Sequence, residues 1–203
     1  MSIWNWVTTT YLSLAFLTFL PTLWAICRGT KLKPGGASFD VSPHFSEKAR
    51  QLLNQHYSRI NGTLSFWKSE AAKNARFHYY CLWWSIISSA LMPIFTQFIE
   101  KGEDVKWLLT AVSIHIALIL GFHKGLRVAE NFRAFRHGES EFYDLYRRML
   151  DMPKRLGDTE QEQVDRYFEQ VEALRRLIRN AETDNLPTLD NIRTPQRSGP
   201  TSS

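Results

Sequence analysis

The chain has 203 residues, of which 44% are hydrophobic and 22% are charged, and its formal net charge is +5 at pH 7. This length corresponds to one domain or two small ones. The charged residues are unevenly spread, because residues 2–27, 77–99 and 107–123 contain no Asp, Glu, Lys or Arg. Uncharged runs of this length exclude an ordinary soluble globular domain. Two cysteines, Cys27 and Cys81, both at or inside apolar runs, exclude a disulfide framework and a cysteine-based zinc cluster.

Three membrane-spanning helices are predicted from these runs. A helix of about 20 apolar residues, rising about 1.5 Å per residue, crosses the roughly 30 Å hydrocarbon core of a bilayer. We expect an N-terminal transmembrane anchor over residues 1–28 and a transmembrane hairpin made of residues 77–99 and 105–123. The first run differs from a cleaved signal peptide, because no basic residue precedes it and its apolar stretch is too long.

The charges that flank the runs predict an orientation. Basic residues follow the first run, precede the second and follow the third, where the positive-inside rule places cytoplasmic charge. These residues are Arg28, Lys31, Lys33, Lys68, Lys73, Arg76, Lys124 and Arg127. The connector over residues 100–106 carries three acidic and two basic residues. We therefore expect a multi-pass protein of the inner (plasma) membrane, with the N-terminus outside and the C-terminus in the cytoplasm. Membrane lipid is the expected partner and nucleic acid is not.

The segments outside the membrane are predicted to be helical, with linkers at two places. Residues 29–44 contain a Pro-Gly-Gly sequence and are interpreted as an irregular linker. Residues 45–183 form the expected helical domain, in which the Asn61–Gly62 pair marks a break or a close approach to a neighbouring helix. Residues 184–203 are rich in proline, serine and threonine and are expected to be a disordered tail.

The second and third spans are expected to continue into the cytoplasm as a paired helical stalk. Residues 124–152 contain no proline, and Pro153 supplies the stop. Four charged residues just below the membrane, at helical spacings, are candidates for ion pairs in this stalk. They are Glu130, Arg133, Arg136 and Glu139. We expect them to bridge to the helix that carries Glu70 and Lys73, with lipid phosphates as the alternative partner.

The last predicted helix carries a narrow apolar seam. It starts at Asp158, with Gln161 completing a capping box. The seam residues Val164, Tyr167, Val171, Leu174, Ile178 and Ala181 recur at heptad spacing. Such a seam packs either on the stalk of its own chain, against Phe135, Phe142 and Met149, or on a neighbouring subunit. In both cases Val164, Val171, Leu174 and Ile178 define an assembly helix.

Several sequence features resemble the SLATT family. They are Tyr57-Ser58-Arg59, the hairpin of two spans, and the aromatic residues with Arg-x-x-Glu between Phe132 and Glu139. SLATT proteins have two transmembrane helices and are associated with SMODS nucleotide synthases and SLOG nucleotide sensors. The resemblance covers roughly residues 45–187 and leaves the N-terminal span as an addition. It implies a homo-oligomeric membrane effector of a bacterial conflict system, which perforates or depolarises the membrane when a nucleotide-signalling protein partner acts.

The functional hypothesis is therefore a pore-forming effector in antiviral defence, and the alternative is a non-conducting membrane scaffold that holds a cytoplasmic partner. The sequence has no glycine-rich phosphate loop, no His-Glu-x-x-His motif and no nucleophile elbow. We accordingly expect no enzyme, no catalytic residue, no cofactor and no metal ion.

Polar residues inside the spans are the candidate pore or gating residues. They are Ser85, Ser88, Ser89, Thr110, Ser113 and His115. An ionisable residue as deep as His115 indicates a water-lined path, a proton site or a gate. The alternative is a neutral imidazole that hydrogen-bonds a hydroxyl group on a neighbouring helix, with Thr18, Thr22 or one of the three serines as its partner.

Small residues form a stripe along one face of the third span. Thr110, Ser113, Ala117 and Gly121 are spaced so that they share this face. The stripe is predicted either to pack closely on another helix or to line a narrow polar pore.

Overall fold

The structure is a computed structural model, and it describes residues 2–28 and 38–184. These residues form five α-helices and three short 3-10 helices, with no strand among them, so the all-α prediction is confirmed. The α-helices are α1 (Ile3–Cys27), α2 (Glu47–Thr96), α3 (Glu103–Gly125), α4 (Val128–Asp151) and α5 (Glu160–Asp184). The 3-10 helices are η1 (Phe39–Val41), η2 (Ile99–Lys101) and η3 (Pro153–Arg155).

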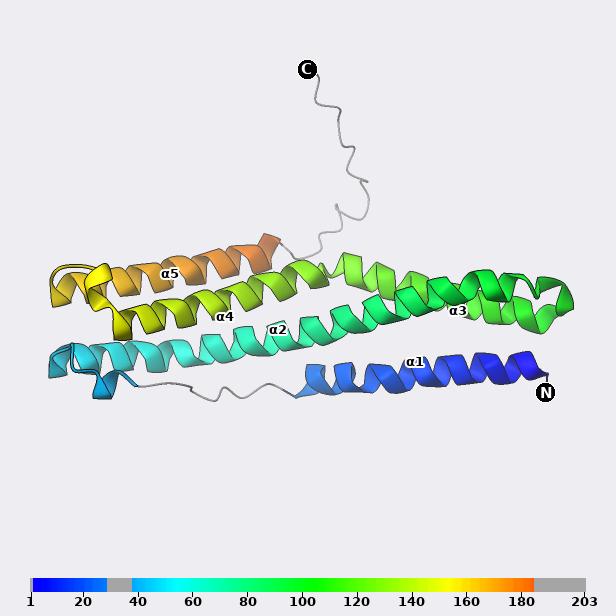
Figure 1. Cartoon of the computed structure of the whole chain (residues 1–203), viewed down its shortest axis with the longest axis horizontal. Helices are drawn as coiled ribbons and strands as arrows, with labels where there is room; N and C mark the ends of the chain where they lie inside the picture. The colour runs from blue at the N-terminus through cyan, green and yellow to red at the C-terminus, as the bar shows by residue number, and fades with distance from the viewer. Residues whose placement is uncertain (1, 29–37, 185–203) are drawn as a thin grey trace, which may run out of the picture.

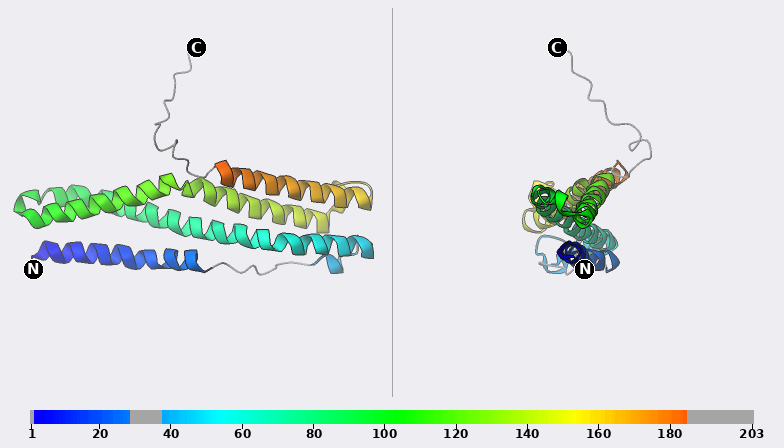
Figure 2. Two further views of the ribbon diagram at one scale, coloured as in Figure 1. Left: turned by 180° about the vertical axis from the view of Figure 1, so that it is seen from behind. Right: turned by 90° about the vertical axis from the view of Figure 1, so that its right-hand side faces the viewer.

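The helices form an elongated rod in which α2 runs from one end to the other (Figure 1). Helices α1 and α3 flank the C-terminal half of α2, and α4 and α5 flank its N-terminal half. The N-terminus lies at the same end of the rod as the turn between α2 and α3, as Figure 1 and the left view of Figure 2 show. The ring of Trp4 on α1 packs against the ring of Phe98 in this turn, with the ring centroids 5.3 Å apart. The chain thus has an apolar bundle of α1, α2 and α3, and a second bundle of α2, α4 and α5.

Two helices, rather than the predicted three, are long and apolar enough to cross a membrane. They are α1 and α3, and in each only 22% of the most apolar 18 residues is buried inside the protein. A core helix of a soluble protein would be mostly buried. The predicted span 77–99 is not among these two helices: residues 77–96 form the C-terminal section of the 50-residue helix α2. Tyrosine, tryptophan, histidine and serine residues in this section lower its mean hydropathy below that of α1 and α3.

Helix α2 is continuous where the sequence predicted a break at the Asn61–Gly62 pair. The helix passes through both residues, and the space beside Gly62 is open, so no neighbouring helix approaches closely there. Glycine costs about 1 kcal/mol relative to alanine inside a helix. Ile60 and Leu64, on either side of the pair, are buried in the core and offset that cost.

The predicted uninterrupted stalk after the third span is wrong. Helix α3 ends at Gly125, and Arg127 adopts a left-handed conformation (φ 45°) before α4 begins. The break is closed by local hydrogen bonds, in which the Leu126 N–H donates to the Phe122 carbonyl (2.9 Å) and the Asn131 amide donates to the Leu126 carbonyl (3.1 Å). It changes the direction of the chain, so that α4 lies between α2 and α5.

The second bundle has a core of aliphatic and aromatic side chains. The heptad seam of α5, formed by Val164, Tyr167, Val171, Leu174 and Ile178, is buried there with Phe135, Phe142 and Met149 of α4. The seam therefore packs within its own chain. Phe39 of η1 is also fully buried in this core, so the described part of the predicted linker, residues 38–44, packs on the second bundle through this side chain. The rest of that linker, 29–37, and the predicted tail beyond residue 184 lie outside the described residues.

Hydrogen bonds at the end of the rod away from the N-terminus cap the start of α5. The capping box lies one residue later than predicted: the Thr159 hydroxyl accepts from the Glu162 N–H (3.3 Å), and the Glu162 carboxylate accepts from the N–H groups of Asp158 and Thr159. The Glu160 carboxylate accepts from both the N–H (2.7 Å) and the hydroxyl (2.6 Å) of Ser46, the N-cap of α2. These two hydrogen bonds lower the pKa of Glu160 and connect the ends of α2 and α5.

Gly138 is the point of closest approach in the second bundle. A Cβ atom at this position would lie 2.7 Å from Cγ1 of Ile178 on α5 and 3.4 Å from the Trp67 ring on α2. The distance to Ile178 is shorter than a van der Waals contact, and the distance to Trp67 is at the lower limit of one. The absence of a side chain at Gly138 therefore sets the spacing of three helices.

We predict that Gly138→Val lowers the free energy of unfolding by about 1–3 kcal/mol, because the added methyl groups overpack the contact with Ile178. The matched control is Gly62→Val, at a position within α2 that has open space beside it. Since valine has a better helix propensity than glycine, this control is expected to leave the stability unchanged or raise it by a few tenths of a kcal/mol. Thermal unfolding in mild detergent measures both, and equal effects of the two substitutions would contradict the proposed close packing.

Candidate functional site

Four polar side chains from three helices meet in the middle of the apolar bundle. The Tyr11 hydroxyl on α1 lies 2.7 Å from Nδ1 of His115 on α3 and 2.8 Å from the hydroxyl of Ser88 on α2. Nε2 of His115 lies 3.2 Å from the hydroxyl of Tyr80 on α2, which in turn donates to the Ala15 carbonyl of α1 (3.3 Å). We call Tyr11, Tyr80, Ser88 and His115 the His115 network.

The direction of each hydrogen bond in this network follows from the Ala15 carbonyl, because a carbonyl can only accept. Because the Tyr80 hydroxyl donates to the Ala15 carbonyl, its oxygen is the acceptor for the Nε2–H of His115. Nδ1 of a neutral imidazole then accepts from the Tyr11 hydroxyl, and the Tyr11 oxygen accepts from Ser88. All four side chains are satisfied by a neutral histidine. The chain of donors ends at a backbone carbonyl, which passes no proton on.

Aromatic rings enclose the network. The Trp84 ring lies edge-on to Tyr11 (centroids 5.2 Å apart) and to His115 (5.5 Å), and its indole N–H donates to the hydroxyl of Thr18 (2.9 Å). Tyr11, Trp84 and Ser88 are all buried, Ser88 completely. Such a network fixes the rotation of each helix relative to the other two, because a hydroxyl turned away in an apolar medium loses its partner.

The structure separates the predicted intramembrane polar residues. Ser88 and His115 belong to the network, while the Ser85 hydroxyl is buried with no hydrogen-bond partner among the described residues. Ser89 and Ser113 are exposed, and Thr110 is exposed and donates to the carbonyl of Lys106 on its own helix. His115 does bind hydroxyl groups on neighbouring helices, but they belong to tyrosines rather than to the predicted serines and threonines.

The sequence reading did not single out Tyr11 and Tyr80. Both lie in apolar runs and near Trp residues, so they were indistinguishable from the aromatic residues that occur near membrane surfaces. For Tyr11 a signal is available in its position well inside its run, at a depth where a phenol hydroxyl needs a partner within the protein; Tyr80, close to the start of its run, carries no such signal.

The small-residue stripe of α3 points away from the bundle. Thr110, Ser113, Ala117 and Gly121 are all exposed, and nothing lies within 4 Å of a Cβ atom placed at Gly121. The opposite face of α3 is buried against α1 and α2 through Val105, Leu108, Val112 and Ile119. The stripe is thus an unoccupied, weakly polar face on the outside of the apolar bundle.

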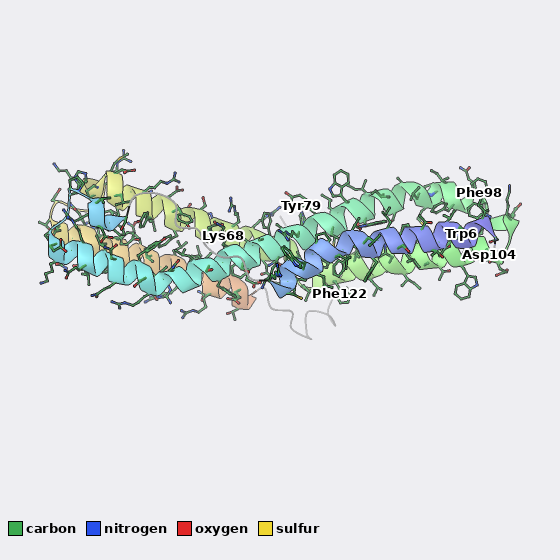
Figure 3. All side chains as sticks on the ribbon, turned by 90° about the horizontal axis from the view of Figure 1, so that it is seen from below. Trp6, Lys68, Tyr79, Phe98, Asp104 and Phe122 are labelled. Carbon is green, nitrogen blue, oxygen red and sulfur yellow. The ribbon has the colours of Figure 1, made fainter. Side chains whose placement is uncertain are left out.

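A second histidine contact lies near the middle of the rod. Nδ1 of His78 on α2 is 2.8 Å from Nε2 of His123 on α3, so the N–H group of one ring donates a hydrogen bond to the other ring. This contact joins α2 and α3 close to Tyr79 and Phe122, while Trp6, Phe98 and Asp104 lie together at the N-terminal end of the bundle (Figure 3).

The predicted stalk charges are only partly brought together. Arg136 and Glu139 form an ion pair on α4 (2.6 Å), in which the Glu139 side chain is 9% exposed and that of Arg136 is 64% exposed. Lys73 pairs with Glu70 on its own helix (2.7 Å). Within the described part of the chain no ion pair joins this α2 pair to the α4 charges, and Glu130 and Arg133 lie exposed on α4. The predicted bridge between the two helices is therefore not observed.

His56 is a partly buried basic group at the contact between α2 and α5. Its ring stacks on Phe168 of α5 (centroids 4.1 Å apart), and its Nδ1 atom is buried without a hydrogen-bond partner. Burial, followed by the charges of Arg59 and Arg175, lowers the pKa of His56 below its ordinary value of 6.5, against a smaller opposite effect of Glu172. The α2–α5 contact therefore favours the neutral ring.

We predict that Tyr11→Phe lowers the stability of the apolar bundle by about 1–2 kcal/mol, because Ser88 and Nδ1 of His115 each lose a partner inside a low-dielectric environment. The matched control is Tyr79→Phe, which removes a hydroxyl from an exposed tyrosine outside the network. Thermal unfolding in detergent and limited proteolysis compare the two. A loss of stability as large for Tyr79→Phe would show that the network contributes nothing specific.

We also predict that the second bundle becomes less stable as the pH falls from 6.5 toward the lowered pKa of His56. In this window the unfolded chain binds a proton at His56 and the folded chain does not, so protonation favours unfolding, whereas above it the ring is neutral in both states. His56→Phe keeps the stacking and is expected to reduce this acid sensitivity. Melting temperatures at pH 7.5 and 5.5 test it, with His44→Phe, at an exposed position, as the control.

Comparison of the chain with protein-family models, with curated proteins and with solved structures finds no match. What the His115 network and the outer face of α3 do must therefore be inferred from their chemistry.

Proposed function

We propose that the chain is an integral membrane protein in which α1, the C-terminal section of α2, and α3 all cross the bilayer. The section of α2 over residues 77–96 packs against both α1 and α3, so it shares their surroundings. Its outer side chains Trp83, Ile86 and Ile94 are exposed and apolar, as lipid contact requires. The basic flanks support an orientation with the N-terminus and the α2–α3 turn outside, and with the second bundle in the cytoplasm.

Within this topology we propose an oligomeric, pore-forming membrane effector of a nucleotide-signalled bacterial defence system, similar to SLATT proteins. The observation that carries the proposal is the outward face of α3. Thr110, Ser113, Ala117 and Gly121 are exposed there, where lipid would otherwise surround hydroxyl groups and small side chains. In membranes such faces associate, because small residues let helix backbones approach and hydroxyl groups find partners across the contact.

The proposed pore lies between subunits and not inside one chain. The interior of the apolar bundle is filled, since Leu108 and Val112 are fully buried and the polar groups of the His115 network are bound to one another. A conducting path therefore needs several copies of α3 around an axis, with the hydroxyl groups of Thr110 and Ser113 as its polar lining. The second bundle, at the cytoplasmic side, is the surface on which a signalling partner would act.

The second candidate function is a non-conducting scaffold that holds a cytoplasmic partner. The closure of the His115 network favours it, because a bundle whose polar groups are already satisfied is stable without conducting anything. The two candidates differ in one measurable property, which is the permeability of the membrane when the protein is present.

Induced expression is expected to depolarise bacterial cells, and the purified protein is expected to release a dye from liposomes. Ser113→Leu should weaken each subunit contact roughly three- to thirtyfold, the equivalent of the ~0.6–2 kcal/mol that a hydrogen bond between membrane helices contributes. Ser13→Leu is the matched control, because Ser13 is an exposed serine of α1 outside the stripe. Leak and oligomer size in mild detergent should fall together in Ser113→Leu alone.

A wild-type protein that inserts into membranes and causes neither depolarisation nor dye release would contradict the pore and support the scaffold. Equal loss of leak in Ser13→Leu and Ser113→Leu would contradict the assignment of the α3 face.

A further inference from the structure

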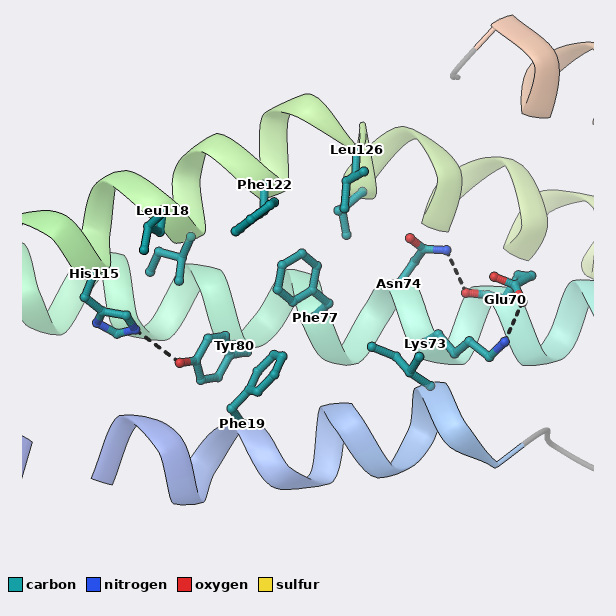
Figure 4. A pocket seen from close by; sticks show the side chains of 13 residues that line it. Phe19, Glu70, Lys73, Asn74, Phe77, Tyr80, His115, Leu118, Phe122 and Leu126 are labelled. Carbon is teal, nitrogen blue, oxygen red and sulfur yellow. Dashed lines mark hydrogen bonds and ion pairs between the residues drawn. The ribbon is translucent and has the colours of Figure 1, made fainter. Parts of the chain in front are cut away.

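A groove of about 580 Å³ lies between α1, α2 and α3, on the half of the apolar bundle next to the second bundle (Figure 4). Its walls are apolar and aromatic side chains, among them Phe19 of α1, Phe77 of α2, and Leu118 and Phe122 of α3. This volume is within the roughly 300–1,000 Å³ of small-molecule binding sites. The shape and lining suit a hydrocarbon chain.

Polar groups are present only at the two ends of the groove. Glu70, Lys73 and Asn74 lie at the end next to α4, and Tyr80 and His115 lie at the end inside the apolar bundle (Figure 4). The latter two bind each other and the rest of the His115 network. Lys73 binds the Glu70 carboxylate (2.7 Å). A ligand in the groove therefore meets hydrocarbon along its length and charge at one end.

The charged residues that line the groove balance each other, and the excess of positive charge comes from basic residues beside the lining. The ion pair of Glu70 and Lys73 is balanced, and two further basic residues follow close in sequence to the groove walls. Arg76 is one turn further along α2, where its guanidinium donates to the Pro21 carbonyl of α1 (3.3 Å), and Lys124 follows Phe122 on α3. These positions are at the predicted cytoplasmic surface of the membrane, where basic residues attract anionic lipid headgroups.

We propose that this groove binds an anionic phospholipid of the cytoplasmic leaflet, with one acyl chain between Phe77 and Phe122 and the headgroup phosphate at Lys73 and its basic neighbours. The proposal rests on the membrane insertion stated under Proposed function, and it does not depend on pore formation. The apolar walls exclude a nucleotide or sugar, because the buried polar groups of such a ligand would have no partners. The basic residues beside the mouth favour an anionic headgroup over a zwitterionic one.

The test measures lipid retention by the full chain purified in mild detergent, using native mass spectrometry with phosphatidylglycerol or phosphatidylcholine added. We expect one tightly retained phosphatidylglycerol per chain and weaker retention of phosphatidylcholine. Leu118→Trp should abolish retention, because the indole fills the groove. The matched control is Leu120→Trp, two residues away on α3, which is exposed to a similar degree (43% against 53%) and does not line the groove.

A second pair of variants tests the headgroup. Lys73→Gln should reduce the preference for phosphatidylglycerol about fivefold, the factor that one basic residue contributes at an anionic membrane surface. Lys68→Gln, which lies outside the groove, should leave the preference unchanged. Equal retention of the two lipids by the wild-type chain, or unchanged retention in Leu118→Trp, would overturn the proposal.

The result is separable from that of the proposed function. Membrane insertion is measured by resistance to alkaline extraction, and pore formation by depolarisation, so each can fail while lipid retention is still observed. A chain that resists extraction, depolarises cells and yet retains neither lipid would overturn the lipid site alone.

Discussion

One uninterrupted helix, α2, takes part in both bundles, and the arrangement of every other helix depends on it. Over its 50 residues the chain provides two different surfaces: an aliphatic and aromatic seam for α4 and α5, and then Tyr80, Trp84 and Ser88 for α1 and α3. Because a helix is stiff along its axis, the position of each bundle is set by the other. Both α3 and α4 pack on α2, and the break between them makes this possible. At the break Arg127 adopts a left-handed conformation, so the chain leaves the direction of α3 before α4 begins.

The two bundles satisfy their polar groups in different ways. In the second bundle the charges are exposed, as at Arg136, or paired on one helix, as at Glu70 and Lys73, and water remains available to them. In the apolar bundle the polar groups of the His115 network bind across helices, from Tyr11 through His115 to Tyr80. If lipid surrounds the bundle, a network hydroxyl that loses its cross-helix partner finds no water to replace it, so these bonds specify how the three helices face one another.

The sequence predicted the features that follow a regular period and missed those that depend on how helices are rotated. The seam of α5 was predicted residue by residue, because heptad spacing alone decides which side chains share a face. The partners of His115 were not, because which tyrosine faces it depends on the rotation of α1 and α2. At the Asn61–Gly62 pair the low helix propensity of the two residues predicted a break that the structure does not have. The burial of Ile60 and Leu64 outweighs this local preference and keeps α2 continuous. The break at Arg127 has no local signature beyond Gly125.

The division between inner and outer faces of α3 connects these observations to function. Its inner face contributes His115 to a closed network and Val112 to a filled interior, so the centre of the bundle at these two residues offers no path for an ion. Its outer face combines Ser113 with Gly121, which provide neither the bulk that lipid contact favours nor a partner within the chain's own bundle. A membrane helix gains from such a face only when another helix covers it, because lipid and leucine are equally apolar and small residues add close packing only against a second backbone. The outer face of α3 is therefore the basis of the proposed contacts between chains, while α2 packs against the other helices of its own chain.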